Sequence, residues 1–192
     1  MSTSNKPSYL GLLNAIAIAE GRAQTYLCAW AERTPSADVR RVLLTVAARE
    51  GEHAASFAKR INELGYEVRR KEADELDKAM AIVTSDRSDL EKMKALKLHR
   101  LDTGDKPDIF DDFFKDHSID IRTGELLGRY IAEERDTARL LRACYEELKL
   151  HAGEASDGHE SSSNGVGRLE AKVDALCAAV DELRRLVGSS PN

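Results

Sequence analysis

The stretch "AAREGEHAASF", from Ala47 to Phe57, places charged side chains within an apolar helical pattern. Apolar residues recur at helical spacing on both sides of it, so this segment has to bury one face. Glu50 and His53 share that face, because residues three apart are neighbours on a helix. Burying a carboxylate without a partner is costly. Either these two side chains point to solvent, or they face inward and bind something.

The composition of the chain favours helices. Of its 192 residues, 33% are charged and only 5% are aromatic, and Ala, Leu, Glu and Arg are abundant. This bias is typical of helical proteins rather than of sheets. We therefore expect an all-α fold.

Charge and cysteine spacing exclude several classes of protein. The formal net charge is −5 and no stripe of Lys and Arg recurs, which argues against a nucleic-acid partner. No apolar run reaches the roughly 18 residues that a membrane-spanning helix needs, so we expect no membrane partner. The three cysteines are far apart and form no CxxC pair, which argues against a disulfide framework or a zinc site. These features together predict a cytoplasmic protein.

Apolar periodicity predicts two long helices at the start of the chain. The first covers about residues 8–33, and the second follows the "RTPSAD" break and ends near Leu64. We expect Thr34 to cap the second helix, with Pro35 at its first position, where the missing N–H costs nothing. Gly65 is the expected C-terminal stop.

Shorter helices and one long helix are expected further on. "EADELDKAMAIV" and "SDLEKMKALKLHRL" each predict a short helix, and Ser88 with Glu91 forms a capping box at the start of the second one. The last long helix is expected over about residues 120–150. These helices would complete a domain spanning residues 1–150.

The composition changes after this domain. Residues 151–167 are polar and rich in Gly and Ser, which predicts a flexible linker. Apolar residues then alternate in four-three steps over residues 168–188, which is the pattern of a coiled coil. A single helix this short cannot bury its seam alone. We therefore expect a homo-oligomer formed through this helix, and docking of the helix on the rest of the chain is the alternative.

Three glutamates interrupt three separate apolar stripes, and their heights along the predicted helices match. Glu20 lies 15 residues before Pro35, and Glu50 lies 15 residues after it. At 1.5 Å per residue, both are about 22 Å from the turn, so they face each other in an antiparallel pair. Glu134 falls about 14 residues into the last helix, again near its middle. With His53 they form a set of carboxylates and an imidazole that iron or manganese would use.

These residues resemble the ferritin-like or rubrerythrin-like superfamily. The resemblance covers about residues 8–150 and rests on "EGEH", an E-x-x-H on the second helix, at the height of Glu20. "IAEERDTARLLRACYEEL" is similar to the final helix of that superfamily. The resemblance implies an antiparallel four-helix bundle whose metal ligands are Glu20, Glu50, His53 and Glu134. It also implies one or two iron (or manganese) ions and oxidation of Fe(II) by oxygen or peroxide, as in a ferroxidase or peroxidase.

The sequence also departs from the family pattern. Thr137 stands where a second His is expected, and no glutamate fits the third helix. Glu133 lies on an alternative stripe, so either it or Glu134 faces inward. The chain therefore holds one metal or an asymmetric pair, or it is a metal-free relative that serves as an oligomeric scaffold or interaction module. No catalytic residue is assigned.

Overall fold

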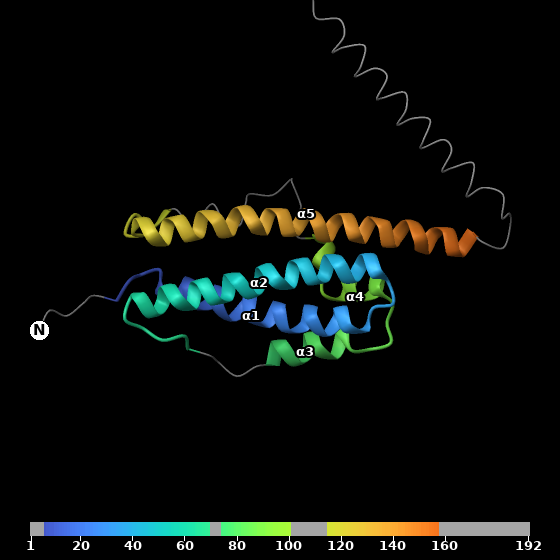
Figure 1. Cartoon of the computed structure of the whole chain (residues 1–192), viewed down its shortest axis with the longest axis horizontal. Coiled ribbons are helices and arrows are strands. Elements are labelled where there is room, and N and C mark those ends of the chain that lie inside the picture. Colours follow the sequence, from blue (N-terminus) through green and yellow to red (C-terminus); the bar gives the residue numbers. More distant parts are fainter. Residues whose placement is uncertain (1–5, 70–73, 101–114, 158–192) are drawn as a thin grey trace, which may run out of the picture. The chain divides into compact units, whose positions relative to one another are not determined.

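All the regular structure in residues 6–69, 74–100 and 115–157, the ranges that the computed structural model describes, is helical (Figure 1). The α-helices are α1 (Leu10–Arg33), α2 (Ala37–Glu63), α3 (Asp74–Val83), α4 (Asp89–Ala95) and α5 (Ile121–Asp157), and a 3₁₀ helix, η1 (Leu98–Arg100), follows α4. The all-α prediction is confirmed. Within those ranges there are three long helices and two short ones, and a fourth long helix is not among them.

The turn between α1 and α2 differs from the prediction in its capping residue. Ser36, not Thr34, caps α2, and its hydroxyl accepts a hydrogen bond from the backbone N–H of Val39. Thr34 instead ends α1, and its hydroxyl donates to Asp89 Oδ2 at 2.6 Å. The hydroxyl of Thr34 is therefore engaged by a residue distant in sequence, which a local capping pattern cannot reveal. Pro35 precedes the cap and does not begin the helix.

Asp89 joins α4 to the α1–α2 hairpin. Its other carboxylate oxygen, Oδ1, accepts a hydrogen bond from Trp30 Nε1 at 2.6 Å, and Trp30 is fully buried. The predicted capping box of Ser88 and Glu91 is present at the start of α4. A residue with a positive φ of 58°, Lys97, follows α4 and separates it from η1.

The buried apolar side chains form two clusters, one on either side of the middle of the long helices. The cluster nearer the α1–α2 turn combines Leu27, Trp30, Ala31, Val39, Leu43, Val46, Ala47, Val83, Met93, Leu98, Leu141 and Cys144. The other combines Tyr9, Leu10, Leu13, Ile16, Ala17, Phe57, Ile61, Leu127, Tyr130 and Ile131. The early part of α5 joins the beginning of α1, and its later part joins the end of α1. Up to Lys149, α5 therefore runs parallel to α1 and antiparallel to α2.

The start of α5 is fixed by a polar network. Asp120 caps the helix by accepting from the backbone N–H of Thr123 at 3.1 Å. Its Oδ2 also accepts from the Tyr9 hydroxyl at 2.7 Å and from Arg60 at 2.9 Å. Burial alone would raise the pKa of Asp120, but these donors hold it well below its usual range. One carboxylate thus sets the register of α5 against both α1 and α2.

The end of the last helix also differs from the prediction. We expected it to stop near residue 150, but α5 continues to Asp157, into the first residues of the expected linker. The rest of the linker and the heptad helix over 168–188 lie outside the described residues. The end of α2 agrees with the prediction, because Gly65 follows it with a φ of 83°.

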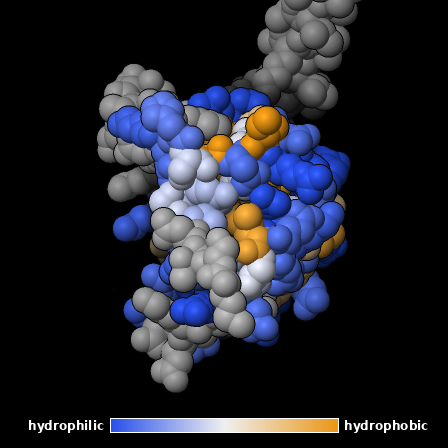
Figure 2. Space-filling view, turned by 90° about the vertical axis from the view of Figure 1, so that its left-hand side faces the viewer, coloured by the Kyte–Doolittle hydropathy of each residue, from blue (hydrophilic) through white to orange (hydrophobic). Residues whose placement is uncertain are grey.

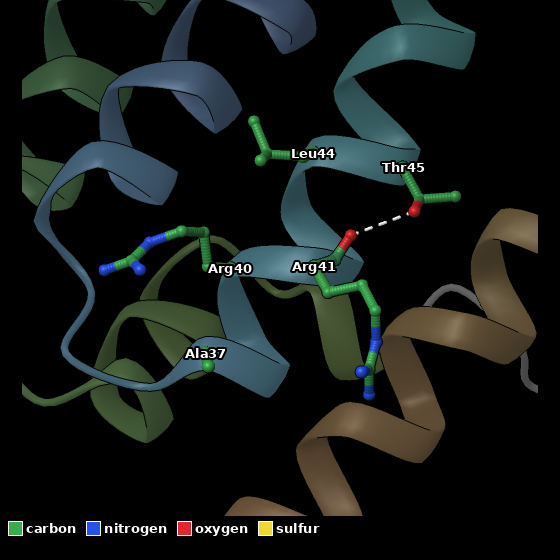
Figure 3. A pocket seen from close by; sticks show the side chains of 5 residues that line it. All are labelled: Ala37, Arg40, Arg41, Leu44 and Thr45. Atoms are coloured by element: carbon green, nitrogen blue, oxygen red, sulfur yellow. Dashed lines mark hydrogen bonds between the residues drawn. The ribbon is translucent and has the colours of Figure 1, made fainter.

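Among the described residues, the large hydrophobic side chains that are exposed are Leu44, Ile121 and Leu150. Figure 2 shows one face, on which the visible described residues are largely hydrophilic and hydrophobic areas are small and separate. The outer side of α2 carries polar side chains together with the exposed Leu44. There Arg41 pairs with Asp38 at 2.8 Å. The Thr45 hydroxyl donates to the Arg41 carbonyl at 2.9 Å (Figure 3). In the part of the chain that the structure describes, no helix combines the length and apolar character needed to cross a membrane.

We predict that Asp89→Ala destabilises the protein by about 3 kcal/mol, because two donors, Trp30 Nε1 and the Thr34 hydroxyl, lose their acceptor. Urea denaturation measures the free energy of unfolding. Asp86→Ala, at an exposed position just before α4, is the control and should change it by less than about 0.5 kcal/mol. Equal effects of the two substitutions would contradict this role of Asp89.

Candidate metal centre

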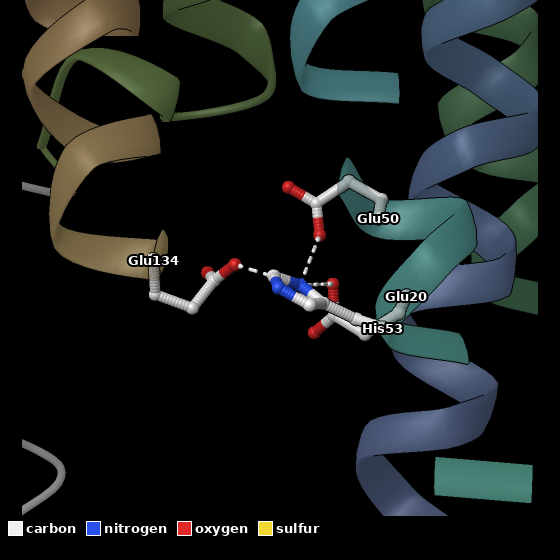
Figure 4. A group of neighbouring side chains, drawn as sticks. All are labelled: Glu20, Glu50, His53 and Glu134. Atoms are coloured by element: carbon white, nitrogen blue, oxygen red, sulfur yellow. Dashed lines mark ion pairs between the residues drawn. The ribbon is translucent and has the colours of Figure 1, made fainter. Parts of the chain in front are cut away.

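The structure brings together all four residues that the sequence singled out as metal ligands. Glu20 comes from α1, Glu50 and His53 from α2, and Glu134 from α5 (Figure 4). One potential ligand atom from each lies within 4.8 Å of those of the others. Glu20, Glu50 and His53 are buried, and Glu134 is partly buried. Within the described residues this is the one such group of three or more His, Cys, Asp or Glu side chains.

The expected facing of Glu20 and Glu50 depends on the close packing of α1 against α2. A Cβ atom on Gly51 would lie only 2.3 Å from Nε2 of Gln24, so glycine lets the Gln24 side chain lie against α2 beside the cluster. A Cβ on Gly21 would lie 3.8 Å from the Cβ of Ala54, which is ordinary contact. Alanine would therefore fit at position 21, and at position 51 it would require only that the end of the exposed Gln24 side chain move.

His53 is oriented by a carboxylate outside the cluster. Its Nε2 lies 2.6 Å from Glu133 Oε2, and Glu133 also accepts a hydrogen bond from Arg129 at 3.0 Å. Burial would raise the pKa of Glu133, but these two partners lower it below its usual value. Glu133 is therefore an ionised acceptor for the Nε2–H of His53. This is the arrangement in which a second carboxylate orients a metal-binding histidine.

The other ring nitrogen of His53 faces the three remaining carboxylates. Nδ1 lies 3.5 Å from Glu134 Oε1, 3.8 Å from Glu50 Oε2 and 4.0 Å from Glu20 Oε2. Both candidates on α5 thus reach His53, at opposite sides of its ring. Glu134 belongs to the cluster, and Glu133 supports it from outside. The sequence left these two roles open because both glutamates lie on apolar stripes.

Tyr130 closes one side of the site. Its hydroxyl donates to Glu20 Oε1 at 2.9 Å, and its ring stands edge-on to the ring of His53, with centroids 5.0 Å apart. Arg22, which could have neutralised Glu20, instead pairs with Glu75 on α3 at 2.9 Å. The sequence pattern gives no signal for the bond between Tyr130 and Glu20.

Burial of so many acids changes their protonation. Burial and the neighbouring carboxylates of Glu50 and Glu134 raise the pKa of Glu20 to about 9. Burial also raises the pKa of Glu134. For His53 burial would lower the pKa, but the surrounding carboxylates, Glu134 first among them, outweigh burial and raise the pKa to about 10. Protons therefore compensate the buried charge when no cation is bound.

Two atoms of the cluster are buried without a hydrogen-bond partner, namely His53 Nδ1 and Glu134 Oε1. Buried polar atoms are normally satisfied, and a cation between these two atoms would satisfy both. Protein ligands bind such ions at about 2.0–2.2 Å, so two ligands on opposite sides of one ion lie about 4.2 Å apart. The spacing within the cluster, up to 4.8 Å, therefore fits one ion after side-chain shifts of a few tenths of an ångström.

Thr137 lies where a second histidine was expected, and its side chain is buried. Its hydroxyl has no hydrogen-bond partner. The departure noted in the sequence thus leaves a second unsatisfied polar group on α5, one turn beyond Glu134.

Comparisons of the chain with protein-family models, with curated proteins and with solved structures found no match. Inferences about function therefore rest on the geometry and chemistry of this cluster.

We predict that the stability of the metal-free protein decreases as the pH rises from 5 to 9. Glu20 shifts from its ordinary 4.5 to about 9 in the fold, so the folded state retains a proton that the unfolded state loses across this range. His53 shifts from 6.5 to about 10, and its contribution is present below pH 6.5 and is lost between these values. Both groups act in the same direction.

Thermal unfolding in the presence of a chelator, at pH 5, 7 and 9, measures this dependence. Glu20→Gln, which stays neutral at every pH, should reduce it. A melting temperature that rises over the same range in the wild-type protein would contradict the protonation of the cluster.

Proposed function

We propose that this chain is a ferritin-like metal-binding protein that holds one iron or manganese ion through Glu20, Glu50, His53 and Glu134. The observation that carries the proposal is that His53 Nδ1 and Glu134 Oε1, buried and 3.5 Å apart, make no hydrogen bond, inside a group whose potential ligand atoms lie within 4.8 Å of one another. The parallel run of α5 beside α1, and the antiparallel α1–α2 hairpin, are consistent with a ferritin-like arrangement of the long helices.

The donor set suggests the identity of the ion. Carboxylates with one imidazole suit iron and manganese, whereas a site with thiolates would favour zinc or an iron–sulfur cluster. Bound iron would supply redox chemistry, and we propose oxidation of Fe(II) by oxygen or peroxide as the activity. The contribution of the chain is to bind and orient. Glu133 fixes the His53 ring, Tyr130 holds Glu20, and the apolar clusters on both sides exclude water.

The second candidate is a metal-free bundle that acts as an oligomeric scaffold. One observation favours it specifically. Protons can compensate the cluster without a metal, because Glu20 remains neutral up to about pH 9 and His53 remains charged up to about pH 10. The two candidates therefore differ in whether a cation displaces these protons. Metal affinity that rises with pH is expected only for the first.

Expression in medium supplemented with iron and manganese should yield about one ion per chain, measured by elemental mass spectrometry, since the four side chains fit a single ion. Glu50→Ala and His53→Ala should weaken binding of the ion by at least about 100-fold in a titration of the metal-free protein. Loss of an outer partner alone typically costs 10–100-fold, so Glu133→Gln should fall in that lower range.

The control is Glu146→Gln, which alters an exposed glutamate of α5 and should leave metal binding unchanged. Melting temperatures of all variants show whether each is folded. Substoichiometric metal in the wild-type protein, unchanged in Glu50→Ala and His53→Ala, would reject the metal proposal in favour of the scaffold.

We also propose that the chain self-associates through the heptad pattern over 168–188, on the sequence argument alone. Removing residues 158–192, which leaves α5 complete, should reduce the mass measured by light scattering to that of a smaller species. An unchanged mass would show that the oligomer, if one forms, uses another surface. Full-length protein with Leu176 and Leu183 changed to Asp tests the seam itself and should behave like the truncated chain.

A further inference from the structure

A second group of buried polar atoms lies beside the cluster and remains unexplained by a cation. Arg49 NH1 and Thr137 Oγ1 are both buried and make no hydrogen bond. Arg49 immediately precedes Glu50 on α2, and Thr137 lies one turn beyond Glu134 on α5. These two atoms without a hydrogen bond therefore come from α2 and α5, which also supply ligands of the metal cluster.

The guanidinium of Arg49 contacts the turn of α5 that contains Asp136. Its NH2 pairs with Asp136 Oδ2 at 2.6 Å, and Asp136 is the residue before Thr137. The charge of Arg49 also acts on Glu134, whose pKa it lowers against the stronger effect of burial. Arg49 therefore contacts α5 at the residue before Thr137 and acts on Glu134, which lies one turn before Thr137.

The chemistry of Arg49 determines what the missing partner is. A guanidinium has only donors and is always charged, so it cannot ligate a metal ion, and its free N–H requires an acceptor. The Thr137 hydroxyl is a second donor. A buried donor without an acceptor costs about 1–3 kcal/mol, and here two such donors come from neighbouring positions on α2 and α5. The complementary partner is an oxygen atom that carries negative charge.

The proposed ion has room for such a partner. Iron and manganese commonly take about six ligands in octahedral sites, whereas the cluster supplies four side chains. The guanidinium of Arg49 can be reached from solvent, since the Arg49 and Asp136 side chains are 29% and 41% exposed. Thr137 is only 3% exposed, so a molecule that reaches its hydroxyl has to be small.

We propose that Arg49 and Thr137 form a binding position for a small oxyanion of the size of formate, next to the metal ion. This inference rests on the proposed metal site, because the ion supplies the remaining attraction for an anion in a region with several glutamates. Arg49 donates from NH1 and Thr137 donates from its hydroxyl. Arg49 keeps its ion pair with Asp136 through NH2.

The test uses full-length protein loaded with Co(II), whose visible absorption reports changes in its ligands. After the Co(II) content has been measured, formate is titrated. We expect the Co(II) bands to change in the wild-type protein, and we expect Thr137→Val and Arg49→Lys each to weaken formate binding about tenfold, as expected for the loss of one hydrogen bond to a charged group.

Two measurements separate this role from a structural one. Thr137→Val removes an unpaired buried hydroxyl, so without formate its melting temperature should equal or exceed that of the wild-type protein. The double variant Arg41→Lys/Thr45→Val makes the same substitutions on the outer side of α2, where the hydroxyl of Thr45 is already paired (Figure 3). It should bind formate as the wild-type protein does.

The possible outcomes are distinct. A protein that binds no Co(II) overturns both the metal site and this inference. A protein that binds Co(II) but whose bands do not respond to formate overturns this inference alone, leaving water as the partner of the two donors. A response that is equal in the wild-type protein, Thr137→Val and Arg49→Lys also overturns it. A response weakened in these two variants alone supports it.

Discussion

The burial of acidic side chains at the middle of the long helices is the constraint on which the rest of the structure depends. Glu20 and Glu50 are almost as buried as the apolar side chains around them, and one apolar cluster lies on each side of them along the helices. Ionised carboxylates in such surroundings have to be compensated by protons, by donors or by a cation. The structure contains the first two, and its unpartnered atoms leave room for the third.

Neighbouring residues adapt the helices to this constraint. Gly51 leaves space against α2 for the end of the exposed Gln24 side chain. Tyr130 donates to Glu20, and Glu133 accepts from His53. Each of these residues would be unremarkable in an ordinary helical core. Together they keep the side chains of the cluster in fixed orientations, which reduces the reorganisation that binding of an ion would require.

The sequence predicted the helices and the four central residues because these depend on periodicity and height. Equal distances of Glu20 and Glu50 from Pro35 were enough to place them opposite each other. Other features depend on contacts between distant segments and could not be read from local patterns. Thr34 looked like a helix cap, but its hydroxyl bonds to Asp89. Glu133 and Glu134 looked equivalent, and only the position of His53 between them separates their roles.

The origin of the four clustered residues has a consequence for how the protein folds. The α1–α2 hairpin supplies three of them from helices joined by a short turn, so these three meet through local contacts. The fourth, Glu134, lies on α5. Its neighbour Glu133 is 80 residues from His53 in the sequence, so Glu134 reaches the cluster only through a long-range contact. Closing that long loop costs chain entropy before the contacts of α5 can offset the cost. Hairpin formation is therefore expected to precede the docking of α5. An ion held by all four side chains would therefore stabilise the docked state of α5. Its binding free energy would be added to the attachment of α5 rather than to the stability of the hairpin.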